Sequence, residues 1–84
     1  MTYANNYGNI LHIATQYGNV KILTKLLKTD IYNVNHLDKH DRTPIFYSVM
    51  KDDFESVKAL YQKLAFLDFQ DKEGMSIIDY ARKN

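Results

Sequence analysis

The sequence predicts an all-α fold built from repeated helix–turn–helix units. The stretch NILHIATQYGNVKILTKLL aligns with TPIFYSVMKDDFESVKALY at a spacing of 34 residues, so that His12 falls on Phe46. A partial third copy follows at a spacing of 33 residues, with Asp38 falling on Asp71. Self-similarity at a period of 20–50 residues is typical of repeat architectures, in which each unit buries its apolar face against its neighbours.

Length and composition are consistent with one small globular domain. The chain has 84 residues, of which 45% are hydrophobic and 25% are charged. This composition is that of a packed domain and not of a disordered chain. We therefore expect a single domain over 1–84, with repeats at about 4–37 and 38–70 and a partial third at 71–84.

Charge and cysteine content exclude several classes of function. The formal net charge is +1, which argues against a nucleic-acid partner held by a large basic field. The chain has no cysteine, and therefore no disulfide framework or thiolate metal site. It has no signal-peptide pattern and no apolar run of the roughly 20 residues that a membrane span needs. We expect a cytoplasmic or nuclear protein that has no membrane partner.

The first unit has two short helices separated by a glycine. Gly18 can adopt the left-handed conformation that ends a helix, and the second helix follows Asn19. Apolar residues at helical spacing give this outer helix its predicted buried face: Val20, Leu23, Leu26 and Leu27.

The second unit begins with the only proline of the chain. Thr43 is expected to cap the inner helix with its side chain, and Pro44 stands at the first helical position, where its missing N–H costs nothing. Asp52 takes the place of the glycine, since aspartate is one of the few other residues that tolerate the left-handed region. The outer helix is expected over about 54–64, with a buried face of Phe54, Val57, Leu60, Tyr61 and Leu64.

Three hexapeptides at corresponding positions resemble the T-P-L-H-x-A signature of ankyrin repeats, whose period is about 33 residues. They are NILHIA at 9–14, TPIFYS at 43–48 and SIIDYA at 76–81. The pairs Gly18-Asn19 and Leu26-Leu27 and the stretch VNHLD at 34–38 also fit the family pattern. The resemblance covers nearly the whole chain and implies an ankyrin-type solenoid of two full repeats and a partial third, joined by β-hairpin loops.

The resemblance also implies finger-like loops between the repeats, near 34–43 and 67–76. Their tips are DKHDR at 38–42 and DKEGM at 71–75. Gly74 suits the turn of the second finger, whereas Asp41 replaces that glycine in the first and predicts a strained turn. Tyr7 stands where the first copy would have its glycine, so we expect the finger there to be incomplete.

No pattern indicates catalysis, a cofactor or a metal site. The resemblance implies that His12 is a structural hydrogen-bonding residue at the start of its helix. His36 and His40 could form a metal pair, but no carboxylate or thiolate pattern accompanies them. The serines lack a nucleophile-elbow motif, and no glycine-rich phosphate loop is present. We therefore expect a protein that is not an enzyme.

Lysines form a stripe on the first outer helix, at Lys21, Lys25 and Lys28. Such a stripe is most simply a solvated helix face. The alternative is a contact with an acidic partner or with a membrane surface.

The resemblance implies that the chain binds another protein, of unknown identity, through the fingertips and the exposed side of the inner helices. The matching positions are Asn5, Asn6, Gln16, Tyr17, Lys39, His40, Arg42, Met50, Lys51, Lys72, Glu73 and Met75. Tyr17, Met50 and Met75 are candidate apolar anchors, with completion of the core as the alternative. Arg42 is the best charged candidate. We expect Lys39, Arg42 and Met50 to share one exposed concave strip, so that alanine at Arg42 and Met50 weakens binding with little change in melting temperature.

Two functions are compatible with the sequence: a protein-interaction module, or a structural or oligomerisation segment of a longer ankyrin array or multidomain protein. We expect the chain to be part of such an array, because the third copy stops after its inner helix. Its C-terminal end is apolar, at Leu64, Phe66, Leu67, Phe69, Ile77, Ile78 and Tyr80. It could be covered by self-association or by another chain, or closed by Tyr80, Arg82 and Lys83 as a polar cap.

Overall fold

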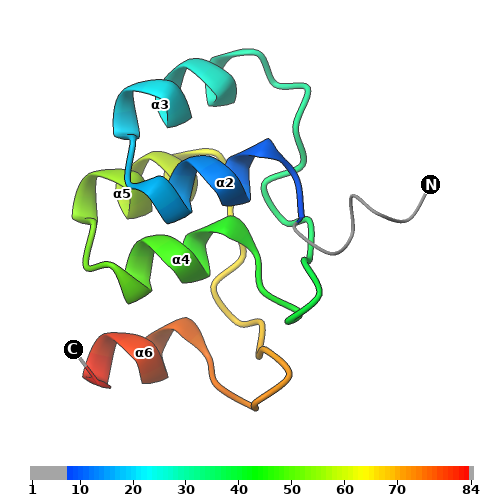
Figure 1. Ribbon diagram of the computed structural model, residues 1–84, viewed down its shortest axis with the longest axis vertical. Coiled ribbons are helices and arrows are strands. Elements are labelled where there is room, and N and C mark those ends of the chain that lie inside the picture. The colour runs from blue at the N-terminus through cyan, green and yellow to red at the C-terminus, as the bar shows by residue number, and fades with distance from the viewer. Residues whose placement is uncertain (1–7, 84) are drawn as a thin grey trace.

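The computed structural model describes residues 8–83 and confirms the ankyrin-type helical architecture. Its helices are α2 (Ile10–Tyr17), α3 (Val20–Lys28), α4 (Pro44–Met50), α5 (Phe54–Gln62) and α6 (Ile77–Lys83). The inner helices α2, α4 and α6 follow one another in a row (Figure 1), and the outer helices α3 and α5 pack against each other. Residues 8–83 contain no β-strand, so the loops between the repeats are turns and not paired strands.

Helix α2 begins with a reciprocal cap. The Asn9 side chain accepts a hydrogen bond from the Leu11 N–H at 3.0 Å, and His12 Nδ1 accepts one from the Asn9 N–H at 3.0 Å. Two backbone donors that the first turn leaves unpaired are thereby satisfied. The helix ends at Gly18, whose φ of 69° is the predicted left-handed conformation.

Helix α4 begins without a side-chain cap, which corrects the expected role of Thr43. Thr43 stands at the N-cap position, but its side chain is fully buried and its hydroxyl has no hydrogen-bond partner within residues 8–83. Pro44 occupies the first helical position as predicted, and its fixed φ supplies the helical geometry. Asp52 follows the helix with a φ of 58°, the left-handed conformation expected of it.

Helix α6 begins with a cap between Ser76 and Asp79. The Ser76 N–H donates to Asp79 Oδ2 at 2.9 Å, and the Asp79 N–H donates to Ser76 Oγ at 3.3 Å. The three inner helices therefore start in three different ways, although they stand at equivalent places in the repeat.

The core lies where the inner and outer helices meet. Its buried apolar side chains include Leu11, Leu23, Leu27, Ile45, Phe46 and Leu60, and Leu26, Val57 and Phe69 pack against it in part. At about 25 cal/mol per Å² of apolar surface, such burial is the main favourable contribution to folding.

The predicted buried face of α5 is wrong at three positions. Phe54 is 74% exposed, Tyr61 is 59% exposed and Leu64 is 78% exposed. Helix α5 packs against α3 and α4 through Leu60 and its neighbours, and these three side chains lie outside that contact. Leu64 also lies beyond the helix, which ends at Gln62, and it has a φ of 67°.

The two fingers have the same hydrogen-bonded turn. In the first, the Asp38 N–H donates to the Arg42 carbonyl at 3.0 Å; in the second, the Asp71 N–H donates to the Met75 carbonyl at 2.9 Å. The glycine position of this turn has positive φ in both, 60° at Asp41 and 78° at Gly74. Asp41 thus adopts the left-handed conformation of the replaced glycine, which aspartate tolerates better than most residues, and strain in this turn stays a prediction.

Candidate partner-binding surface

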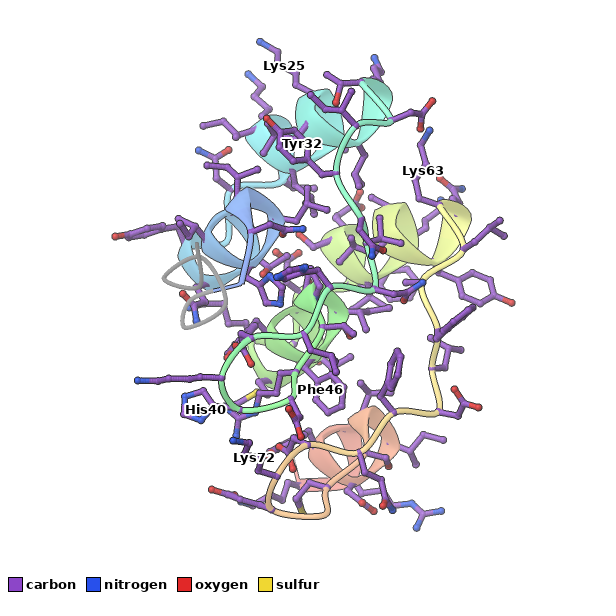
Figure 2. The ribbon with its side chains drawn as sticks, turned by 90° about the vertical axis from the view of Figure 1, so that its right-hand side faces the viewer. Lys25, Tyr32, His40, Phe46, Lys63 and Lys72 are labelled. Carbon is purple, nitrogen blue, oxygen red and sulfur yellow. The ribbon has the colours of Figure 1, made fainter. Side chains whose placement is uncertain are left out.

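Four of the predicted contact residues form one exposed fingertip surface. Lys39 and His40 lie on the first finger, and Lys72 and Glu73 lie on the second. The Lys72 N–H donates to the His40 carbonyl at 2.9 Å, so the two tips are joined through their backbones. Figure 2 shows the His40 and Lys72 side chains near each other on adjacent loops. We call these four residues the fingertip surface.

A second group of predicted contact residues lies at the other end of the inner helices. Gln16 and Tyr17 end α2, and Lys51 follows α4; all three are exposed, and Tyr17 is 80% exposed. A helix of seven residues rises roughly 10 Å, so this group is about one helix length from the fingers. The predicted residues therefore form two groups and not one continuous strip.

The two methionines are not exposed anchors. Met50 and Met75 are each half-buried and pack against the core. The alternative interpretation, that they complete the core of a short chain, fits their positions. Tyr17 is the one candidate anchor among the described residues that projects into solvent.

Arg42 is not on an exposed strip, which corrects the sequence-based expectation. Its side chain is only 13% exposed. Its Nε donates to Asp71 Oδ2 at 3.0 Å, and its Nη2 donates to the Tyr80 hydroxyl at 3.0 Å. The guanidinium carbon also lies 5.7 Å from the ring centroid of Tyr47 and 5.6 Å from that of Tyr80. Arg42 therefore holds the second and third repeats together.

An aspartate–tyrosine pair recurs in the two repeats that Arg42 connects. The Tyr47 hydroxyl donates to Asp38 Oδ2, and the Tyr80 hydroxyl donates to Asp71 Oδ2, each across nine positions of sequence. The first copy has Ile13 where the others have tyrosine. The sequence signal for this network is two Asp-to-Tyr spacings of nine residues in equivalent positions, and the sequence-based predictions did not include it.

In this network the Asp71 carboxylate is ionised at neutral pH, whereas the Tyr47 and Tyr80 hydroxyls are neutral. Burial alone would raise the pKa of Asp71, but hydrogen bonds from Tyr80, from backbone N–H groups and from Arg42 hold that pKa below its usual value. Burial, together with the hydrogen bond to Asp38, raises the pKa of Tyr47 to about 12. Burial and the bond to Asp71 likewise raise the pKa of Tyr80. An ionised carboxylate with neutral tyrosine donors is a stable arrangement at neutral pH.

His12 has the structural role that the resemblance implied. It is fully buried, and its Nε2 donates to the Arg42 carbonyl at 2.8 Å while Nδ1 accepts from the Asn9 N–H. Burial lowers the pKa of His12, although the Arg42 carbonyl favours the protonated ring. The neutral ring therefore connects the first repeat to the finger of the second.

Among residues 8–83, no group of three or more histidines, cysteines or acidic residues is arranged to hold a metal ion. Within the same range, every helix is too short or too polar to cross a membrane. The predicted contact residues Asn5 and Asn6 lie outside the described residues.

Comparison with known proteins decides the family. The sequence matches the family described as "Ankyrin repeats (3 copies)" over residues 2–84. The chain belongs to the ankyrin-repeat family. Ankyrin repeats are generally protein–protein interaction modules, which agrees with a repeat scaffold that carries a joined fingertip surface.

Two larger proteins contain similar ankyrin segments. The "Transient receptor potential cation channel subfamily A member 1 homolog" of Caenorhabditis elegans is 30% identical over 98% of this chain. The "Regulatory protein NPR1" of Arabidopsis thaliana is 32% identical over 87% of it. The matching part covers only 7% and 12% of those two proteins. This ankyrin chain thus corresponds to a small part of each relative.

Proposed function

We propose that this ankyrin chain is a non-catalytic module that binds a protein partner in the cytoplasm or nucleus through its fingertip surface and the exposed ends of its inner helices. The observation that carries this proposal is the backbone bond between Lys72 and His40, which joins two exposed loops into one surface. The ion pair between Arg42 of the first finger and Asp71 of the second also connects the two loops. Loops held in one geometry lose little conformational entropy on binding.

The chemistry of the surface suggests how a partner is recognised. Lys39, His40, Lys72 and Glu73 provide polar and charged contacts, while Tyr17 provides an apolar anchor at the far end. Aromatic side chains surrounded by polar residues are frequent energetic centres of interfaces. The partner is therefore expected to span both groups of residues.

Site-specific photocrosslinking tests this function. A photoreactive amino acid at His40 or Lys72 should capture a partner from cell extract, whereas the same group at Arg82, exposed on α6, should not. With the photoreactive residue kept at His40, the variant K72A/E73A should lose the captured protein and keep its melting temperature. Capture that is equal from all three positions, or unaffected in the variant, would contradict a fingertip interface.

A second candidate function is self-association, or a structural role in a longer array, through the C-terminal end. The observation that favours it is a set of apolar side chains that are each more than 40% exposed: Phe54, Tyr61, Leu64, Phe66, Leu67 and Ile78. A soluble monomer rarely exposes a large apolar patch, so these side chains would favour a covering partner wherever they lie together. Tyr80 does not cap this end, since it is buried in the Arg42 network.

Sedimentation at several concentrations tests the second function. Association that rises with concentration, and that Phe66→Glu abolishes, would support it. A strictly monomeric chain at high micromolar concentration would exclude self-association.

A further inference from the structure

The outer helices enclose a groove that the proposed function does not use. It lies between α3 and α5 and has a volume of about 220 Å³. Its lining residues are Thr24, Leu27, Lys28, Ala59, Gln62 and Lys63. Leu27 and Ala59 form an apolar floor that belongs to the core or packs against it. The groove can therefore accept an apolar side chain from outside.

A lysine stripe on α3 reaches this groove at one end. Lys21, Lys25 and Lys28 are all exposed and follow one another at four and three residues, which places them on one face of α3. Lys28 lines the groove directly. Helix α3 contains no acidic residue, and among residues 8–83 no salt bridge involves these three lysines. The nearby Asp30 is already paired with Lys63 at 2.7 Å.

Helix electrostatics explain only part of the stripe. Lys25 and Lys28 lie in the last turn of α3, where cations complement the helix dipole. Lys21 lies in the first turn, where the dipole disfavours a positive charge. The first turn has no acidic side chain to compensate it. A positive charge at Lys21 is therefore better explained by an external anion than by helix stability.

We propose that the α3–α5 groove binds an acidic segment of a protein, whose aliphatic side chain enters between Leu27 and Ala59 while flanking carboxylates pair with the lysine stripe. Charge complementarity selects this occupant, because Lys28 lines the groove beside its apolar residues and Lys25 and Lys21 continue from it along one exposed face of α3. A concave groove favours an inserted side chain over a flat anionic surface. The net charge of +1 makes a purely electrostatic attraction weak at long range.

This surface is separate from the fingertips. In Figure 2, Lys25 projects at the top of the molecule beside α3, whereas His40 and Lys72 lie on the fingers toward the bottom. The ankyrin chain could thus hold two protein segments simultaneously, one on each face. A negative result for one of the two proposed sites would therefore not contradict the other.

The test uses the peptide Glu-Asp-Glu-Leu-Glu-Asp-Glu carrying a fluorescent label, with a copy in which serine replaces leucine. Fluorescence anisotropy with the full chain should show weak binding of the leucine peptide and weaker binding of the serine peptide. The variant K21E/K25E/K28E should lower the affinity by about tenfold or more, since exposed ion pairs contribute modestly but three are reversed. The variant R82E/K83E reverses two exposed charges on α6, outside every proposed contact surface, and should have little effect.

Two groove variants separate insertion from charge attraction. Ala59→Leu and Thr24→Phe each fill the groove from within without adding a charge. Each variant should lower the affinity for the leucine peptide to that for the serine peptide, while the three lysines of the stripe are unchanged. Melting temperatures identify any variant that fails to fold. The comparison of the leucine and serine peptides uses the unmodified chain and therefore does not depend on the folding of any variant.

Several outcomes would overturn the proposal. A loss in R82E/K83E that is as large, per charge reversed, as the loss in the lysine triple would show that net charge alone attracts the peptide. Tighter binding to phosphatidylserine vesicles or to single-stranded DNA than to the leucine peptide would assign the stripe to a membrane or nucleic acid. Equal affinity of the leucine and serine peptides would show that nothing enters the groove, and no measurable binding would contradict the site altogether.

Discussion

Arg42 and Asp71 form an ion pair at 3.0 Å across the boundary between the second and third repeats, and the Asp71 side chain has no exposure to solvent. The carbonyl of the same arginine accepts a hydrogen bond from His12 in the first repeat. A single finger residue thus contacts the repeats on both sides of its own.

Arg42→Ala should destabilise the chain by about 3 kcal/mol, because it leaves the buried Asp71 carboxylate without its positively charged partner. That is a large part of the stability of a small domain. Chemical denaturation by urea, followed by circular dichroism, measures the change. Lys72→Ala, at an exposed position on the neighbouring finger, is the control and should change stability by less than about 0.5 kcal/mol. An unchanged urea midpoint for Arg42→Ala would indicate that the Arg42 side chain lies on the exposed surface, as its position in the sequence suggested.

His12 should make stability depend on pH. Burial lowers the pKa of His12 below the value of 6.5 that it has when unfolded. The unfolded chain therefore binds the proton first as pH falls, and the contribution of neutral His12, complete above pH 6.5, is lost as pH falls through the folded pKa. Urea midpoints should decrease from pH 7.5 toward acid, and His12→Gln should flatten the decrease over this range. An equally steep pH dependence in the glutamine variant would assign it to other groups.

The starts of helices α4 and α6 should respond oppositely to loss of a hydroxyl. Thr43→Val removes a buried hydroxyl without a partner and keeps the shape, so it should leave stability unchanged or raise it. Ser76→Ala removes a hydroxyl that accepts from the Asp79 N–H and should cost about 1 kcal/mol. Thermal unfolding of both variants provides the comparison. A loss of stability in Thr43→Val as large as that in Ser76→Ala would restore the capping role of Thr43.

Ser48→Ala should raise stability by up to about 1 kcal/mol. Ser48 is fully buried and its hydroxyl has no hydrogen-bond partner within the described residues. Burying a hydroxyl without a partner is unfavourable. The equivalent positions of the other copies, Ala14 and Ala81, have alanine. A clear loss of stability in Ser48→Ala would show that the hydroxyl has a partner that the static structure does not contain.

The sequence predicted the repeat fold and its turns because their signals are local. Gly18 and Asp52 both adopt the left-handed conformation that their positions required. Helical spacing also correctly identified Leu23 and Leu27 as core residues. These properties depend on the residue and its neighbours in sequence.

What the sequence could not predict depends on contacts between distant segments. Phe54 and Tyr61 have the spacing of core residues, yet helical spacing does not reveal which side of α5 is covered. Arg42 follows Lys39 and His40 in a polar fingertip, and only the position of Asp71, 29 residues later, shows that its side chain turns inward. The same reasoning explains why Met50 was placed on the surface although it packs against the core.

The position of Arg42 has a consequence for how the chain unfolds. A linear repeat array can lose its end units one at a time, because each interface between neighbours breaks independently. Here both interfaces include the same finger residue, through its carbonyl on one side and its guanidinium on the other. Displacing that finger weakens the two boundaries together, so partly unfolded species with one boundary intact should be scarcely populated. The three repeats are thereby expected to melt as a single cooperative unit.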